Sequence, residues 1–161
     1  MDPQIGGIRK IRSKHSSMAL EVLGSGTNDG QRVVQNPYVG SDNQKFTFEP
    51  VGDGYYKIVA KHSGKVLDVE GWGTDDGAWI QQWAYLDPPL NPPGHNNNQK
   101  WKPEPVGDGY YKIVSKHSGK VLDVRDWGTH GGAWIQQWAY LDPPLNPPGH
   151  NDNQRWAIEP G

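Results

Sequence analysis

Short apolar runs alternate with turn residues along the whole chain. In the middle third they are Tyr55–Val59, Val66–Val69, Ala78–Trp83 and Lys100–Lys102. Each is rich in aromatic or β-branched residues, and turn sequences such as Gly-Asp-Gly and His-Ser-Gly-Lys separate the first two from what precedes them. Runs of this kind predict β-strands. We expect the fourth strand to stop at Pro103, because proline cannot donate to a strand ladder.

The pattern repeats. Residues 51–105 and 106–160 align without a gap and differ at nine of 55 positions, which are 60, 70, 71, 75, 76, 97, 100, 102 and 103 with their partners 55 residues later. The shared text includes VGDGYYKIV, KHSGKVLDV and GAWIQQWAYLDPPLNPPGHN. Self-similarity over a fixed period indicates a repeat architecture.

A divergent first copy precedes these two. Lys10–Ser16 matches Lys57–Ser63 at an offset of 47, whereas Gln44–Phe46 matches Gln99–Trp101 at an offset of 55. The first copy therefore lacks eight residues, which fall after Tyr38.

The three units lie near residues 4–50, 51–105 and 106–160. Three four-stranded units cannot each bury a core alone, and three copies without caps favour closure around a pseudo-threefold axis over a solenoid. We therefore predict an all-β fold with twelve strands, and one domain over residues 1–161.

The composition and charge of the chain limit the classes of partner and cofactor that we expect. The 161 residues include 21 Gly and 14 Pro, so turns dominate, and 8 Trp and 7 Tyr supply much of the apolar surface. A formal charge of −2 gives no reason to expect nucleic acid or an anionic membrane, and the chain has no transmembrane-length apolar run. The lack of Cys excludes disulfides, thiolate nucleophiles and Cys-ligated zinc. We expect no metal or other cofactor.

A Gln-x-aromatic motif ends every unit, at Gln44–Phe46, Gln99–Trp101 and Gln154–Trp156. Together with GKVLDV and the Asp-Gly-Ala-x-Ile-Gln-x-Trp pattern in fixed order, it resembles the ricin-B-type β-trefoil lectins, also met as carbohydrate-binding modules of glycosidases. The resemblance covers the whole chain. It implies a β-trefoil with one shallow sugar site in each repeat.

The resemblance also implies which residues bind sugar. In that family a site uses an Asp on the second strand, a Gln and an aromatic residue on the third, and an Asn-Gln pair before the last Trp. The matching residues are Asp68, Gln81, Trp83, Asn98 and Gln99 in repeat two, and Asp123, Gln136, Trp138, Asn153 and Gln154 in repeat three. Repeat one has Glu21, Val34 and Asn36 at the first three positions, so we expect that site to be inactive or very weak.

These residue types suit a pyranose. An indole covers the apolar C–H face of the ring, and a carboxylate accepts hydrogen bonds from two neighbouring hydroxyls. Amide side chains donate and accept, so they discriminate hydroxyl orientation.

Further contacts remain open. Trp79 and its copy Trp134 share a strand face with the platform tryptophans, and either widen the platform or pack against a neighbouring loop. The proline-rich loop 86–96 and its copy 141–151 lead into the Asn-Gln pair. They either form a rigid wall in which His95 and His150 touch sugar, or are stiff surface loops.

Other conspicuous residues have structural interpretations. We expect Trp101 and Trp156 in the core, whereas Trp72 and Trp127 either form a hydrophobic lid or pack on the site. Acidic turn residues such as Asp76 are interpreted as turn formers, because a glycosidase needs two carboxylates that converge on one bond.

The leading functional prediction is a non-catalytic lectin with two competent sites, binding galactose- or N-acetylgalactosamine-type ends of oligosaccharides and glycoconjugates. One alternative is a targeting module of a larger glycosidase or toxin, for example for plant polysaccharide. Another is an inhibitor or interaction scaffold, which would not need the five site residues to recur. The N-terminus lacks the features of a signal peptide, which favours a cytoplasmic or non-classically secreted chain, although a trimmed secreted chain would look the same. Homodimerisation is left open.

Overall fold

The computed structural model describes residues 5–87, 93–141 and 149–161. Twelve strands belong to one sheet. They are β1 (Ile8–Ser13), β2 (Ala19–Val22), β3 (Val33–Asn36), β4 (Phe46–Gly52), β5 (Tyr55–Ala60), β6 (Val66–Val69), β7 (Ile80–Trp83), β8 (Trp101–Gly107), β9 (Tyr110–Ser115), β10 (Val121–Val124), β11 (Ile135–Trp138) and β12 (Trp156–Pro160). Single 3₁₀ turns connect them at η1 (Leu23–Ser25), η2 (Asp42–Gln44), η3 (Glu70–Trp72), η5 (Asn97–Gln99), η6 (Arg125–Trp127) and η8 (Asp152–Gln154).

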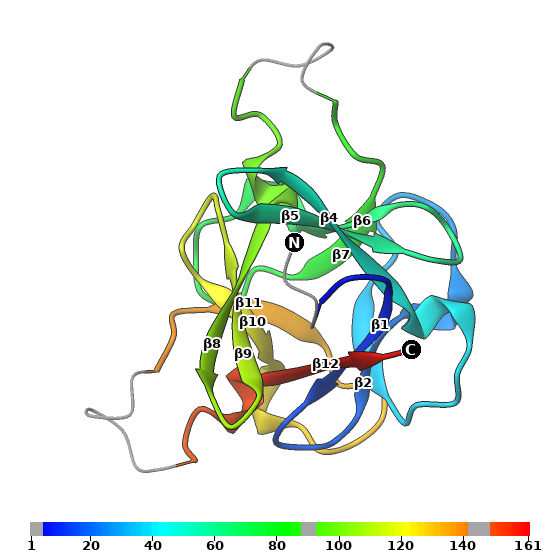
Figure 1. The fold of residues 1–161 in the computed structure, drawn as a ribbon, viewed down its shortest axis with the longest axis vertical. Helices are drawn as coiled ribbons and strands as arrows, with labels where there is room; N and C mark the ends of the chain where they lie inside the picture. Colours follow the sequence, from blue (N-terminus) through cyan, green and yellow to red (C-terminus); the bar gives the residue numbers. More distant parts are fainter. Residues whose placement is uncertain (1–4, 88–92, 142–148) are drawn as a thin grey trace.

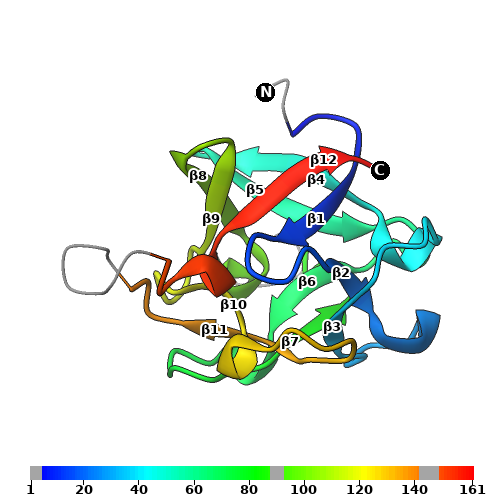
Figure 2. The ribbon, with the colours of Figure 1, turned by 90° about the horizontal axis from the view of Figure 1, so that it is seen from below.

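Six strands close a barrel. Antiparallel pairs run from β1 to β12, β9, β8, β5, β4 and back to β1. The hairpins β2–β3, β6–β7 and β10–β11 gather at one end of this barrel (Figures 1 and 2). The prediction of a β-trefoil built from three four-stranded repeats is confirmed.

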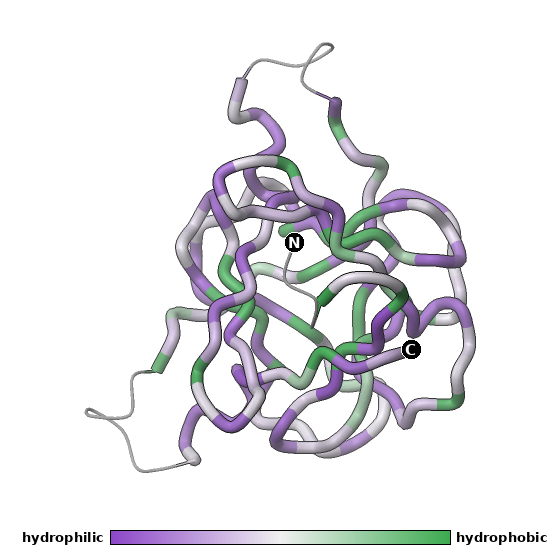
Figure 3. The backbone as a smooth tube through the Cα atoms, in the orientation of Figure 1, coloured by the Kyte–Doolittle hydropathy of each residue, from purple (hydrophilic) through white to green (hydrophobic). Residues whose placement is uncertain are grey.

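The core is built from matching residues of the three repeats. The largest buried side chains come in threes: Phe46, Trp101 and Trp156; Ile11, Ile58 and Ile113; and Leu20, Leu67 and Leu122. Each such side chain contributes about 1.5–3 kcal/mol by leaving water. Hydrophilic residues concentrate in the outer turns (Figure 3). Trp101 and Trp156 have no exposed surface and donate through Nε1 to the carbonyls of Leu67 and Leu122 at 3.1 Å, as core residues would.

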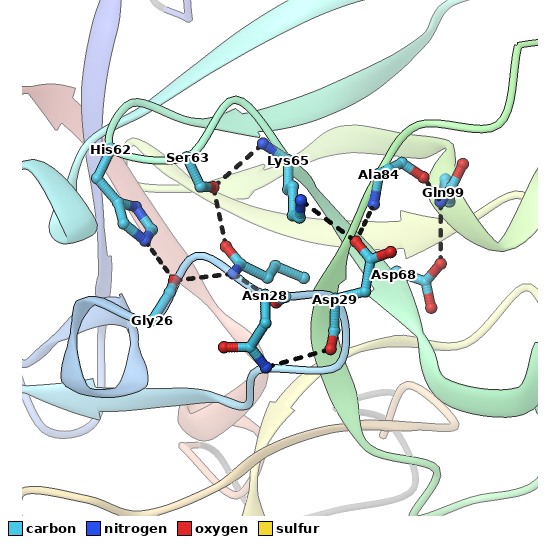
Figure 4. Close-up of polar contacts among 10 residues, drawn as sticks. Gly26, Asn28, Asp29, His62, Ser63, Lys65, Asp68, Ala84 and Gln99 are labelled. Carbon is cyan, nitrogen blue, oxygen red and sulfur yellow. Dashed lines mark hydrogen bonds and ion pairs between the residues drawn. The ribbon is translucent and has the colours of Figure 1, made fainter.

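Buried glutamines join one repeat to the next. Gln82 Nε2 donates to the carbonyls of Gly26 at 2.8 Å and Asn28 at 2.9 Å, and its Oε1 accepts from Ser63 Oγ at 2.9 Å. Figure 4 shows the three partners of Gln82, which are Gly26, Asn28 and Ser63. Gln35 and Gln137 hold the matching loops of repeats three and two. Each hairpin loop is thereby held against the next repeat around the ring.

The prediction that the fourth strand stops at Pro103 is wrong. Strand β8 continues to Gly107, and Pro103 and Pro105 pair with Ile113 and Tyr111 of β9. The two prolines are two residues apart, so their nitrogens point to the same edge of the strand. Beyond Trp101, no neighbour in the described part of the chain pairs with the edge opposite β9, and proline is tolerated where its missing N–H faces such an edge.

Candidate functional site

A buried carboxylate lies at the centre of each candidate site. Asp68 on β6 stands directly opposite Gln81 on β7 in the strand ladder. Gln81 Nε2 donates to Oδ1 of Asp68 at 3.0 Å, and Gln99 Nε2 donates to Oδ2 at 3.0 Å. The hairpin pairing and the η5 turn therefore bring together residues that are up to 31 positions apart.

Repeat three reproduces this geometry. Asp123 accepts from Gln136 Nε2 at 3.0 Å and from Gln154 Nε2 at 3.1 Å. Asp123 stands opposite Gln136 in the ladder, as Asp68 stands opposite Gln81. Both clamps thus offer a carboxylate held in one orientation.

Gln99 and Gln154 lie behind the carboxylates. Gln99 has no exposed surface, donates also to the carbonyl of Ala84 at 3.0 Å, and accepts from the backbone N–H of Leu86 at 3.0 Å. Gln154 makes the same contacts with Ala139 and Leu141. These amides orient the carboxylate and fix the chain that follows the third strand.

The neighbouring asparagines keep an acceptor free. Asn98 donates through Nδ2 to the carbonyl of Val69 at 3.1 Å, and Asn153 donates to Val124 at 3.0 Å. Both Oδ1 atoms are buried and have no hydrogen-bond partner within the described ranges. A buried acceptor without a partner costs about 1–3 kcal/mol, so a donor from a ligand would stabilise it.

The platform tryptophans end the third strands and remain accessible. Trp83 is 37% exposed and Trp138 is 38% exposed. A Cβ on Gly30 of repeat one would lie 3.9 Å from the Trp83 ring, and one on Gly77 of repeat two would lie 3.9 Å from the Trp138 ring. Each indole is therefore flanked by a hairpin loop of the preceding repeat.

The loop that flanks the repeat-two platform also anchors the chain that follows the indole. Asp29 Oδ1 accepts from the backbone N–H of Ala84 at 2.9 Å and lies 3.4 Å from Lys65 Nζ (Figure 4). Asp76 does the same for Ala139 with Lys120 in repeat three. Sequence reasoning took Asp76 for a turn former and missed this contact, since a link across repeats leaves no local signal.

In repeat three the site is a cavity of about 350 Å³. Four of the five predicted residues line it, namely Asp123, Gln136, Trp138 and Asn153. The other lining residues were not predicted as site residues: Asp126, Trp127 and Leu141. Of the two alternatives for Trp127, the lid agrees with its place in this lining. The left-handed backbone at Asp126 (φ 54°) and Trp127 (φ 55°) turns the η6 segment here, where the sequence shows only a Gly-rich turn.

Burial changes the acidity of both carboxyls. Loss of solvation raises the pKa of Asp68 to about 6, against the opposing effect of hydrogen bonds from Gln81 and Gln99. For the same reason the pKa of Asp123 rises to about 7. The charge of Asp76 adds to this rise at Asp123, as that of Asp29 does at Asp68.

Repeat one fills the corresponding space with its own side chains. Glu21 accepts from Asn36 Nδ2 at 2.7 Å and from Gln44 Nε2 at 3.0 Å. Asn36 stands where the other repeats have the platform indole, and Val34 is buried in place of the site glutamine. Repeat one therefore has no indole platform, and the residue at the platform position, Asn36, donates to the carboxylate of Glu21 instead.

Trp79 and Trp134 lie elsewhere than the platforms. Their rings meet edge to face with centroids 5.1 Å apart, and the Arg32 guanidinium lies 3.2 Å from the Trp79 centroid and 4.6 Å from that of Trp134. Arg32, Trp79 and Trp134 are the same position of the three repeats, so they meet at the pseudo-threefold axis. Of the two alternatives for Trp79, the structure has packing against neighbouring repeats.

The histidines of the proline-rich loops pack on other tryptophans. His95 lies 5.5 Å from Trp72 and His150 lies 4.4 Å from Trp127, between ring centroids. The middle of each loop, at residues 88–92 and 142–148, lies outside the described residues, and so does most of the predicted wall.

Comparison with known proteins decides the family. A family model for ricin-type β-trefoil lectin domain-like sequences matches residues 3–83 and 89–138. The chain belongs to this family.

This ricin-type trefoil is similar to two solved structures and to a segment of one further protein. It is 42% identical to ThreeFoil, a designed 3-fold symmetric protein, over 94% of this chain and 97% of that one, with a TM-score of 0.83. It is 36% identical to 1,3Gal43A, an exo-β-1,3-galactanase from Clostridium thermocellum, with a TM-score of 0.81 over 96% of this chain. A 59-residue segment is 40% identical to the clotting factor G alpha subunit of Tachypleus tridentatus.

The trefoil spans only part of two of these relatives. It covers 30% of the galactanase chain, and the matched segment covers 34% of this chain and 8% of the clotting factor subunit. The ricin-type lectin fold supports carbohydrate binding. Among the residues that the structure describes, no group of three or more His, Asp or Glu could hold a metal ion. The same residues include no helix long and apolar enough to cross a membrane.

Proposed function

We propose that residues 1–161 form one non-catalytic lectin domain that binds galactose- or N-acetylgalactosamine-type sugars at two sites, one in repeat two and one in repeat three. The observation that carries the proposal is the recurrence of one geometry. A buried carboxylate held by two glutamine amides, beside an exposed indole, occurs in repeats two and three at matching distances. Repeat one has Glu21 bonded to Asn36 instead.

Each residue has a role in this proposal. Trp83 and Trp138 stack on the apolar face of the sugar, and Asp68 and Asp123 accept from two neighbouring hydroxyls. The free Oδ1 of Asn98 or Asn153 accepts from a further hydroxyl, while Gln81 and Gln136 border the site. Gln99 and Gln154 position the carboxylates from behind.

Galactose fits this arrangement on chemical grounds. Its axial 4-hydroxyl leaves the C–H groups of C3, C4 and C5 on one face, which gives an indole a continuous apolar surface. Neighbouring 3- and 4-hydroxyls lie at the rim, where a single carboxylate can accept from both. The likeness to an exo-β-1,3-galactanase agrees with a galactose-type ligand.

The residues that recur in repeats two and three suit sugar binding rather than sugar hydrolysis. Repeats two and three each contribute one buried carboxylate, whereas glycoside hydrolysis uses a pair that flanks one bond. Asp126 adds a second carboxyl to the repeat-three cavity, but its side chain is 89% exposed and repeat two has Gly71 at this position. A single shallow site would bind with a Kd of roughly 1 mM, so function would come from multivalent engagement.

Isothermal titration with methyl β-galactoside tests the proposal. Trp83→Ala plus Trp138→Ala should abolish binding at little cost in stability, because both rings are exposed. Asp68→Ala plus Asp123→Ala should also abolish it. The matched control is Glu49→Ala plus Glu104→Ala, which removes two carboxylates paired with Lys57 and Lys112 on the barrel. Full binding by the tryptophan variant would overturn the assignment.

A second candidate is a carbohydrate-targeting module of a larger enzyme. The observation that favours it is the galactanase, in whose chain a similar trefoil accounts for 30% of the length. A module of this kind should adsorb to insoluble β-1,3-galactan without agglutinating cells. Agglutination by the 161-residue chain would favour the free lectin.

A further inference from the structure

A second hollow adjoins the proposed sugar site of repeat three. It measures about 430 Å³ and lies within the connection between β10 and β11. Its lining is Arg125, Asp126, Trp127, Gly128, Thr129, His130, Gly132, Ala133 and Trp134. Asp126 and Trp127 also line the 350 Å³ cavity of the proposed site. The same dipeptide therefore forms part of the wall of both hollows.

The chemistry of this hollow suits a sugar ring. Trp127 is 40% exposed and Trp134 is 37% exposed, so two indoles border one space. The lining also includes Arg125, Thr129 and His130, whose side chains can donate or accept hydrogen bonds. Apolar ring faces beside polar side chains match the two kinds of surface that a pyranose presents.

Repeat two offers a natural comparison. The corresponding hollow is lined by Glu70, Gly71, Gly77, Ala78 and Trp79. Trp72, which stacks on His117 with centroids 4.6 Å apart, is not among its lining residues, whereas Trp127 contacts His150 and also lines the hollow of repeat three. Two indoles thus border the hollow of repeat three, whereas Trp79 alone lines that of repeat two.

The charge of the two hollows also differs. Four of the nine differences between repeats two and three fall in this connection, where Glu70, Gly71, Asp75 and Asp76 become Arg125, Asp126, His130 and Gly131. Of these four residues of repeat two, Glu70 and Gly71 line the hollow, so its lining carries one carboxylate, and the Arg32 guanidinium lies 3.2 Å from the centroid of Trp79, which also lines it. In repeat three Arg125 and His130 join the lining, where the Arg125 guanidinium lies 5.3 Å from the centroid of Trp134 and its Nε lies 3.7 Å from Oδ2 of Asp126.

We propose that the 430 Å³ hollow is an extension subsite that binds the second sugar of an oligosaccharide, and that it accepts a hexuronate there. The terminal sugar occupies the repeat-three cavity, so this inference rests on the proposed function. The second ring packs between Trp127 and Trp134, and its carboxylate faces Arg125. Repeat two, with Glu70 and Asp75, binds the terminal sugar alone and repels the acid.

One-site proteins separate the two repeats. Trp83→Ala leaves repeat three, and Trp138→Ala leaves repeat two. Each is titrated with methyl β-galactoside, lactose, and lactose whose glucose is oxidised to glucuronic acid. The repeat-three protein should bind both disaccharides roughly tenfold more tightly than the monosaccharide. The repeat-two protein should show no gain with lactose and weaker binding of the acid.

Exchanging the lining residues tests the cause. In the repeat-three protein, Arg125→Glu plus His130→Asp should weaken binding of the acid relative to lactose and keep monosaccharide affinity, because neither residue lines the first cavity. Glu70→Arg plus Asp75→His in the repeat-two protein should relieve the repulsion. Monosaccharide binding without any disaccharide gain at repeat three would overturn this inference alone. Failure of the unaltered protein to bind methyl β-galactoside would overturn the proposed function, and the subsite with it.

Discussion

The side-chain amide of Gln99 donates to Oδ2 of Asp68 at 3.0 Å and also to the carbonyl of Ala84 at 3.0 Å. It therefore ties the carboxylate of the second strand to the residue that follows the platform Trp83. The aromatic member of the same motif, Trp101, is fully buried. The Gln-x-Trp motif thus holds the site together from the buried side. In our proposal the ligand contacts the residues that this motif positions, Asp68 and Trp83, and not the motif itself.

Acidification should weaken sugar binding, first at repeat three. Because burial raises the pKa of Asp123 to about 7 and that of Asp68 to about 6, lowering the pH protonates Asp123 before Asp68. A protonated carboxyl loses part of its acceptor capacity. If only the carboxylate binds, affinity at pH 5 should fall roughly 100-fold in repeat three and roughly tenfold in repeat two. Titrations of the two one-site proteins between pH 8 and pH 5 measure this, and equal affinities across that range would contradict it.

Fold stability should change in the opposite direction over the same pH range. The pKa of each carboxyl is higher in the folded protein than in the unfolded chain, so the folded state binds the proton more tightly. The free energy of unfolding should rise as pH falls through about 7 and 6, and this contribution should level off near the unfolded pKa of about 3.9. Urea unfolding at each pH measures it. Asp123→Asn is the control, because it removes one of the two groups and should flatten the curve.

The fold was more predictable from sequence than the walls of the site. Repeats with β-branched runs predict twelve strands, and the resemblance to the ricin-B-type lectins, not periodicity alone, implies Asp68, Gln81 and Gln99 as site residues. Trp79 shares the strand face of Gln81, yet its ring lies against Trp134 and Arg32, because the three copies of this position converge on the axis. Contacts between repeats decide such cases, and periodicity within one repeat carries no information about them.

Removing one glutamine that joins repeats should destabilise the whole trefoil. Gln82→Ala removes a fully buried amide that donates to the carbonyls of Gly26 and Asn28; the Gly26 carbonyl keeps His62 Nε2 at 2.7 Å, whereas the Asn28 carbonyl loses this donor. An unsatisfied polar group that is buried costs about 1–3 kcal/mol. The cost should appear as a lower urea midpoint with an unchanged slope. Gln31→Ala is the matched control, because Gln31 also donates to a backbone carbonyl, that of Leu23, but at an exposed position. Equal urea midpoints for the two variants would show that the buried Gln82 amide contributes no more to stability than the exposed Gln31 amide.

Repeat one should be convertible into a third site. Glu21→Asp, Val34→Gln and Asn36→Trp install the residues of the other repeats. Gly77 flanks the Trp138 ring in repeat three, and a Cβ on the matching Gly132 beside repeat one would meet nothing within 4 Å, which leaves room for an indole. The stoichiometry of methyl β-galactoside should rise from two to three. Asn36→Trp alone is the control and should stay at two. A folded triple variant that still binds two sugars would show that the eight residues missing after Tyr38 are essential to a site.

Losing either platform should abolish cell agglutination while leaving sugar binding at the other site intact. Two sites on one rigid body can gain a factor of about 10²–10⁴ in apparent affinity for a multivalent surface, and that gain needs both sites to be occupied at once. Trp83→Ala and Trp138→Ala should each halve the stoichiometry, keep the Kd for methyl β-galactoside at the surviving site, and weaken binding to galactose-coated beads by at least about 100-fold. Because the repeats are joined by buried glutamines, the spacing of the sites is fixed and no hinge can compensate. A single-site variant that agglutinates as well as the unaltered chain would mean that bridging arises from association between copies of the protein.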